Sequence, residues 1–186
     1  MNKIPLDTGS SIDWLNSGKI LVHPTESIWG LGCDAYNKTA VNNIFKLKKR
    51  DKKKKFILLA SSIDSVEKNL CYLSKTDKEY LSDYWPGPYT FLIKYKENIP
   101  NHLKNDTNKL AVRVSNHLPL KALFKTFNGF IVSTSANISG KKNINDAHNI
   151  IDFFEYDDLA YYDESLGENN SASKIIDLES KAIIRA

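Results

Sequence analysis

FIVSTSANISG, residues 130–140, joins a strand-like run to a segment of small hydroxyl and amide side chains. The β-branched and aromatic residues predict a buried strand over 130–135. The polar residues that follow offer hydrogen-bond donors without bulk, and a polar loop at the carboxyl end of a strand suits a phosphate or a carboxylate. A simple turn rich in serine and asparagine is the alternative interpretation.

A second stretch has the same plan. HPTESIWGLGCDA, residues 23–35, follows a predicted strand over 20–23 and continues with a polar loop that contains Gly30 and Gly32. Glycines let a ligand or another chain segment approach the backbone closely. We interpret His23 as a structural histidine, and Trp29 either as part of the core or as the wall of a pocket. Because a second polar loop of this kind occurs, we favour a ligand site over a simple turn as the interpretation of residues 130–140.

The rest of the chain mixes short helices and strands. Helices are predicted at 12–17 and 40–48, after expected N-caps at Ser11 and Thr39, and at 61–70, 75–85, 118–128 and 146–154. Strands are predicted at 56–61, 89–95, 109–115, 159–162, 174–177 and 182–185. This mixture predicts an α/β or α+β fold, in which helices pack on a twisted, mixed, open sheet. The length of 186 residues fits a single domain over residues 1–186.

The composition is typical of a globular cytoplasmic protein. The hydrophobic fraction is 41%, and no repeat or low-complexity segment interrupts the chain. Cys33 and Cys71 lack metal-binding spacing, so we expect reduced thiols. The first twenty residues lack the apolar core of a signal peptide, and no apolar run reaches membrane-spanning length. We therefore expect a cytoplasmic protein without membrane association.

Positive charge is concentrated in one segment. Residues 46–55 hold eight basic residues and one acid, Asp51, whereas residues 152–168 hold seven acids and no lysine or arginine. This distribution argues against a surface that coats nucleic acid and favours a compact polyanion as the ligand. Lys48 and Arg50 can converge on one anion only if the chain leaves helical geometry there. Most of the lysines at 52–55 are expected to form a solvated face.

Arginine is scarce, with Arg50, Arg113 and Arg185 among 26 basic residues. A planar guanidinium grips phosphate or carboxylate in a way that a lysine cannot, so these three positions favour ligand contact, with chance as the alternative. The chain contains neither GxxxxGK[ST] nor GxGxxG. Neither a P-loop nor a Rossmann-type site is therefore predicted.

The order of several segments resembles the YrdC/TsaC family of threonylcarbamoyl-AMP synthases. The resemblance rests on HPTESIWGLGCDAYN, AVNNIFKLKKR, WPGPYTF, LAVRVSNH, STSANISG and SKIID with a late arginine, in that order over nearly the whole chain. It implies a YrdC-like domain of the short bacterial form and a nucleotidyltransferase reaction. In that reaction L-threonine, bicarbonate or CO2, and ATP accompanied by Mg²⁺ give threonylcarbamoyl-AMP and pyrophosphate. Separate transfer proteins then modify tRNA next to the anticodon, and contact of the chain itself with tRNA is an open expectation.

The resemblance also implies roles for ten residues. Lys48, Arg50, Ser135 and Asn137 match the catalytic tetrad that contacts the ATP phosphates, and Asn143 and Arg185 match further ATP contacts. Thr25, Arg113, Ser133 and Ser173 match threonine-binding positions, with Ser133 matching a backbone contact. No residue is expected to bind a metal directly. The chain departs from the family where Asp51, Ser115 and Ala172 replace prolines, and the Asp51 carboxylate could compete with phosphate for Arg50.

Two alternative functions remain, one of a different class and one a different enzyme. The first is a non-catalytic RNA-binding module in tRNA or ribosome maturation, which the basic segment allows although no RNA-binding motif occurs. The second is a carbamoyl-transfer domain of the hydrogenase-maturation type, which shares the fold but normally lies inside a much longer chain.

Overall fold

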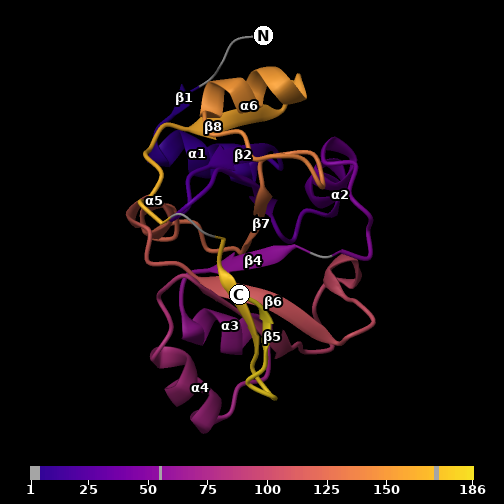
Figure 1. The fold of residues 1–186 in the computed structure, drawn as a ribbon, viewed down its shortest axis with the longest axis vertical. Helices are drawn as coiled ribbons and strands as arrows, with labels where there is room; N and C mark the ends of the chain where they lie inside the picture. Colours follow the sequence, from indigo (N-terminus) through magenta and orange to yellow (C-terminus); the bar gives the residue numbers. More distant parts are fainter. Residues whose placement is uncertain (1–4, 55, 170–171) are drawn as a thin grey trace.

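The computed structural model describes residues 5–54, 56–169 and 172–186. Within them, one ten-stranded sheet carries helices on both faces (Figure 1). The strands are β1 (Pro5–Leu6), β2 (Ile20–His23), β3 (Gly30–Asp34), β4 (Ile57–Ala60), β5 (Tyr89–Lys94), β6 (Lys109–Val114), β7 (Ile131–Ser135), β8 (Leu159–Tyr162), β9 (Lys174–Asp177) and β10 (Ile183–Arg185). The helices are α1 (Thr8–Asn16), α2 (Lys38–Leu47), α3 (Ile63–Asn69), α4 (Lys75–Ser82), α5 (Leu118–Leu123) and α6 (Ala147–Phe154), with a 3-10 turn at Asn101–Leu103. The expected mixed α/β fold is confirmed.

The strand order is β1-β8-β2-β3-β7-β4-β6-β5-β9-β10. The pairs β2/β8, β4/β6 and β5/β9 are parallel, whereas β3 is antiparallel to both β2 and β7. The pairing of β3 with β7 sets Gly30 opposite Ser135 and Gly32 opposite Ser133. The two polar stretches, about a hundred residues apart in the sequence, therefore lie side by side.

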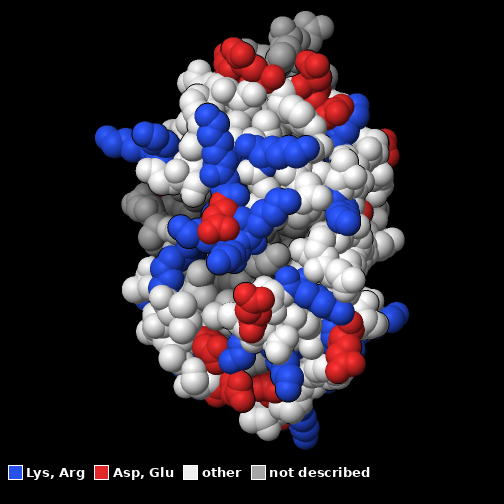
Figure 2. Space-filling model, turned by 90° about the vertical axis from the view of Figure 1, so that its right-hand side faces the viewer, with Lys and Arg blue, Asp and Glu red and all other residues white. Residues whose placement is uncertain are grey.

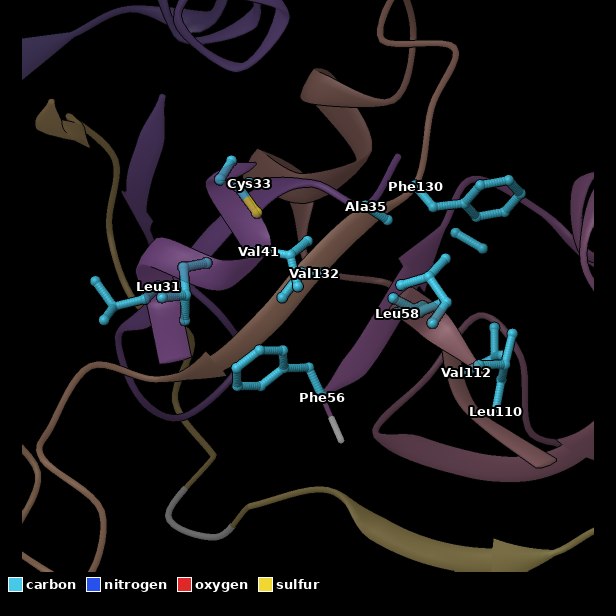
Figure 3. Packing of buried hydrophobic residues seen from close by; sticks show 14 of the residues in the cluster. Leu31, Cys33, Ala35, Val41, Phe56, Leu58, Leu110, Val112, Phe130 and Val132 are labelled. Carbon is cyan, nitrogen blue, oxygen red and sulfur yellow. The ribbon is translucent and has the colours of Figure 1, made fainter. Parts of the chain in front are cut away.

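Alternation along the strands divides the apolar side chains between two cores. The larger core lies between the sheet and helices α2, α3, α4 and α6. Figure 3 shows Leu31, Val41, Leu58, Val112 and Val132, which four strands and α2 contribute along this core. All five are at most 2% exposed, so this part of the sheet face is closed to solvent.

The smaller core occupies part of the opposite face. Leu21, Leu59 and Ile131 point to this side, where Leu15 of α1 and Leu120 of α5 cover them. These two helices cover only one part of the face. The sheet farther along, toward β6, β5 and β9, carries the polar and charged side chains of the candidate site.

The helix starts differ from the predicted ones. Helix α1 begins after Asp7 and α2 begins after Asn37, and each of these side chains accepts an amide of the first turn, at 2.7 and 3.0 Å. Ser11 and Thr39 therefore lie inside helices and are not N-caps. Both true caps are residue types that cap as well as serine, so the cap pattern alone did not distinguish the positions. Helices α4 and α5 end a few residues earlier than predicted.

The larger difference is β3, which forms where a polar loop was predicted. Two glycines in a strand of five residues weaken the usual strand pattern. The strand forms because it pairs on both sides, with β2 and with β7. The glycines are required by packing, since a Cβ on Gly30 would lie 2.6 Å from the His23 ring and one on Gly32 would lie 2.8 Å from it.

Candidate functional site

A cavity of about 760 Å³ opens on the sheet face that α1 and α5 leave uncovered. Side chains of β7, β4, β6, β5 and β9 contribute to its lining. Eight of the ten site residues named from the sequence line it, namely Thr25, Arg50, Arg113, Ser133, Ser135, Asn143, Ser173 and Arg185. The other two, Lys48 and Asn137, do not line the cavity but hold one of its walls. All three arginines therefore contribute to one site or its margin.

Arg113 of β6 is buried and paired at the cavity. Its Nε donates to the carbonyl of Gly87 at 3.1 Å, and its Nη2 forms an ion pair with Glu26. Glu26 also accepts the Ser115 hydroxyl at 2.6 Å. A buried charge requires an opposite charge or hydrogen bonds, so Glu26 fixes the guanidinium in place. Within the described part of the chain, the hydrogen bond and the ion pair of this guanidinium use Nε and Nη2 and not Nη1.

Thr25 shapes the loop that follows β2. Its Oγ1 donates to the carbonyl of Ile28 at 2.7 Å and accepts the amides of Ser27 and Ile28 at 3.3 and 3.2 Å. The amide of Gly167 donates to the Thr25 carbonyl at 2.9 Å, which ties the loop after β8 to this turn. The hydroxyl thus stabilises the turn, and its contact with threonine stays a prediction.

Ser133 of β7 lines the cavity and contacts a buried histidine. Its Oγ lies 3.3 Å from Nε2 of His23, and Nδ1 of His23 lies 3.2 Å from the carbonyl of Pro24. Burial lowers the pKa of His23 to about 4, so the ring is neutral at neutral pH. The interpretation of His23 as a buried histidine with satisfied hydrogen bonds is confirmed.

Lys48 lies behind the loop that follows β7. Its Nζ donates to the carbonyls of Ser135 and Asn137, the second at 2.6 Å, and to Asn137 Oδ1 at 3.1 Å. The Ser135 hydroxyl donates to the same Oδ1 at 2.6 Å. Burial, and secondarily the charge of Arg50, lower the pKa of Lys48 to about 8. The ammonium therefore organises the loop, and direct contact with phosphate stays a prediction.

Arg50 lies just past the end of α2, where the cavity begins. Lys49 has a φ of 48°, so the chain leaves helical geometry there. The Arg50 Nε donates to the carbonyl of Lys54 at 2.7 Å, and the guanidinium carbon lies 5.2 Å from the centre of the Phe56 ring. Burial lowers the pKa of Arg50, which still stays charged at neutral pH. These contacts hold a planar cation at the edge of the cavity.

Lys52, Lys53 and Lys54 are exposed, as predicted, but two of them also line the cavity. Figure 2 shows basic side chains gathered over the middle of one face, with most acids toward its two ends. Lys52 and Lys53 line the cavity, so they are not only part of a solvated face. Asp51 uses its carboxylate to accept the amide of Lys53 at 2.9 Å. Lys55 lies outside the described residues.

Arg185 and Ser173 are joined at the far side of the cavity. Arg185 donates to the Ser173 carbonyl from Nε at 3.1 Å and from Nη2 at 2.6 Å. The Ser173 hydroxyl lies 2.8 Å from Thr90 Oγ1. This pair holds the guanidinium of Arg185 in place at the end of β10. Asn143 is exposed on the cavity lining.

Two residues of the site were not assigned roles from the sequence. Glu26 and Ser115 together fix Arg113, although neither is among the residues that line the cavity. The position of Glu26 in a polar loop directly after a strand was the available signal. Ser115 gave a signal only as a departure from the family pattern.

The described residues contain no group of three or more His, Cys, Asp or Glu side chains that could hold a metal ion. Within the same residues, no helix is both long enough and apolar enough to cross a membrane.

The sheet and the site together define a mixed α/β protein whose cavity is lined by arginine, lysine and hydroxyl side chains. The Sua5/YciO/YrdC family model, described as "Telomere recombination", matches residues 13–186. The chain belongs to this family, which confirms the resemblance seen in the sequence.

Curated relatives and solved structures agree with this assignment. A threonylcarbamoyl-AMP synthase of Acinetobacter baumannii is 38% identical over 179 residues, covering 92% of this chain and 93% of the relative. The enzyme of that name from Saccharophagus degradans is 40% identical over 172 residues, covering 92% and 90%. The structure of P. abyssi Sua5 complexed with L-threonine has a TM-score of 0.84 and 26% identity, covering 95% of this chain and 54% of that chain. The present chain thus spans about half the length of that protein.

Proposed function

We propose that this chain is a threonylcarbamoyl-AMP synthase, a nucleotidyltransferase that makes threonylcarbamoyl-AMP and pyrophosphate from L-threonine, bicarbonate or CO2, and ATP. The names of the curated relatives support the activity, and the threonine complex of P. abyssi Sua5 supports an amino acid as ligand. The product would pass to the proteins that form threonylcarbamoyladenosine in tRNA. We place this reaction in the cytoplasm, where ATP and tRNA are present.

The observation that carries the proposal is the pairing of two kinds of anion site in one cavity. Arg50, which follows α2, and Arg113, on β6, both line this cavity, and protein contacts hold each guanidinium in place. Substrates that bring a triphosphate and a carboxylate require two such cations. A cavity of about 760 Å³ falls in the size range of small-molecule sites.

The reaction itself requires alignment and charge stabilisation more than a strong base. The neutral amine of threonine attacks CO2 and loses one proton, which gives a carbamate. A carbamate oxygen then attacks the α-phosphorus of ATP, and the bond to pyrophosphate breaks. Fixed cations stabilise the charge that develops on the phosphate oxygens. The carbamate and the product both hydrolyse readily, so a partly enclosed site also protects them.

Some residues of the site are proposed to contact the substrates directly, and others to hold those residues in place. We assign contact with ATP to Arg50, Arg185, Ser135 and Asn143, which all line the cavity, while Lys48 and Asn137 hold the loop that carries Ser135. Arg113 would bind the threonine carboxylate through Nη1, with Thr25, Ser133 and Ser173 around the amino acid. Mg²⁺ would enter with ATP and neutralise part of the triphosphate charge. A phosphate-bound ion suits this lining better than a protein-bound one, because its polar side chains are mostly hydroxyls and cations, with Asp106 as the carboxylate.

Pyrophosphate release, measured with each substrate omitted in turn, tests the proposal. We expect release only when ATP, L-threonine and bicarbonate are all present. Release without threonine, or no release from the complete mixture, would contradict the proposal. A pure RNA-binding module releases none. Carbamoyl phosphate in place of threonine and bicarbonate tests the carbamoyl-transfer alternative, and release with that substrate would favour it.

A further inference from the structure

His23 is a buried titratable residue for which the proposed reaction has no direct role. It is 0% exposed and lies opposite Gly30 in the pairing of β2 with β3. The imidazole fills the space that the absent side chains of Gly30 and Gly32 leave, with hypothetical Cβ contacts of 2.6 to 2.8 Å. This tight fit restricts how the ring can turn. A ring held in one orientation can determine in which direction a neighbouring side chain makes its hydrogen bond.

The partners of the ring define its tautomer. Nδ1 faces the carbonyl of Pro24 at 3.2 Å, and a carbonyl can only accept, so Nδ1 carries the proton. Because burial keeps the ring neutral, Nε2 carries none and can only accept. Ser133 Oγ lies 3.3 Å from Nε2 and must donate to it. The single proton of the Ser133 hydroxyl is thereby directed at His23.

We propose that His23 is a positioning residue that makes the Ser133 hydroxyl a hydrogen-bond acceptor for the amino group of the amino-acid substrate. The inference rests on the proposed function, because it names which atom of threonine Ser133 recognises. A serine hydroxyl has one proton and two lone pairs, so once its proton is committed to His23 it offers the cavity lone pairs only. A carboxylate or phosphate has no proton to donate to it, whereas an amine has.

The chemistry of carbamate formation suits a neutral acceptor at this position. A carboxylate would favour the ammonium form, which cannot attack CO2, whereas a hydroxyl oxygen can accept an N–H from the reactive neutral amine. After the nitrogen bonds to CO2 and releases one proton to solvent, the carbamate keeps one N–H. Ser133 can therefore retain its hydrogen bond from the amine to the carbamate. Arg113 would hold the carboxylate of the same molecule, so that both ends of threonine are oriented.

A matched pair of ligands tests the inference without relying on turnover. Calorimetry would compare binding of L-threonine with that of 3-hydroxybutyrate, which has the same chain without the amino group, to the wild type, Ser133→Ala, His23→Phe and the double variant. We expect the preference for threonine to fall about three- to tenfold in each single variant, as the loss of one neutral hydrogen bond implies. The double variant should lose no more. His148→Phe, whose ring contacts Tyr161, serves as the control and should keep the wild-type preference.

Nitrogen NMR of histidine in the wild-type protein provides a readout that needs no variant to fold. We expect His23 to be neutral, with the proton on Nδ1, at pH 7. Protonation on Nε2, or an unchanged ligand preference in folded His23→Phe, would overturn the inference while pyrophosphate release still supports the proposed function. A wild type that binds no threonine and releases no pyrophosphate would overturn both.

Discussion

Acidification should destabilise this protein through His23 in a window defined by its pKa. The ordinary histidine pKa of 6.5 applies to the unfolded chain, and burial lowers the value to about 4 in the fold. At pH values between these two pKa values, His23 is mostly protonated in the unfolded chain and mostly neutral in the folded protein. The stabilising contribution of the neutral ring is therefore complete above pH 6.5 and is lost as the pH falls from 6.5 toward 4.

The magnitude follows from the size of the pKa shift. One pKa unit corresponds to about 1.4 kcal/mol, so a shift from 6.5 to about 4 corresponds to roughly 3 kcal/mol of unfolding free energy across the window. The full value applies because the ring is completely buried and poorly screened by water. Roughly 3 kcal/mol is a large part of the stability of an ordinary domain.

Urea denaturation at several pH values between 7.5 and 4.5 measures this contribution. We compare the wild type with His23→Phe, which removes the titrating group and keeps a flat ring between the two glycines. Other groups titrate in both proteins, so the difference between their pH slopes isolates His23. Ser133→Ala is the control and should keep a slope close to that of the wild type, because burial is the main cause of the shift. Parallel curves for the wild type and His23→Phe would refute the reasoning.

Two further predictions concern the charged residues of the site. Arg50→Ala should reduce pyrophosphate release by about 100-fold or more, because a fixed cation at the phosphates is lost. Lys53→Ala should change the release less than about threefold, because the charge of Lys53 is exposed and screened. Equal losses in this assay would show that the phosphates lie elsewhere. Glu26→Ala should lower the unfolding free energy, measured by urea denaturation, by about 3–5 kcal/mol, because Arg113 would stay buried without the Glu26 carboxylate. A loss below about 1 kcal/mol would contradict the view that Glu26 fixes Arg113.

Much of the site was accessible from the sequence because chemistry restricts residue type. Arg50 and Arg113 stood out because so few arginines occur, and both line the cavity. The chain does leave helical geometry after Lys48, which is the condition that we stated from the sequence for Lys48 and Arg50 to converge on one anion. The buried position of Lys48 was not accessible, because a run of lysines does not show which of them turns inward. The three carbonyl and amide oxygens that receive its Nζ come from residues 135–137, on a distant strand and loop.

Local patterns in the sequence determined most of the helices and strands, the mixed α/β class and the residue types of the site. They could do so because side-chain spacing, capping groups and turn residues act over a few positions. The tertiary structure alone decided that Gly30–Asp34 is a strand, that Glu26 pairs with Arg113, and that His23 meets Ser133. Each of these depends on segments that are far apart in the chain and meet only when the sheet forms. Strand pairing, burial and charge compensation are properties of that assembled sheet, so no short stretch of sequence contains them.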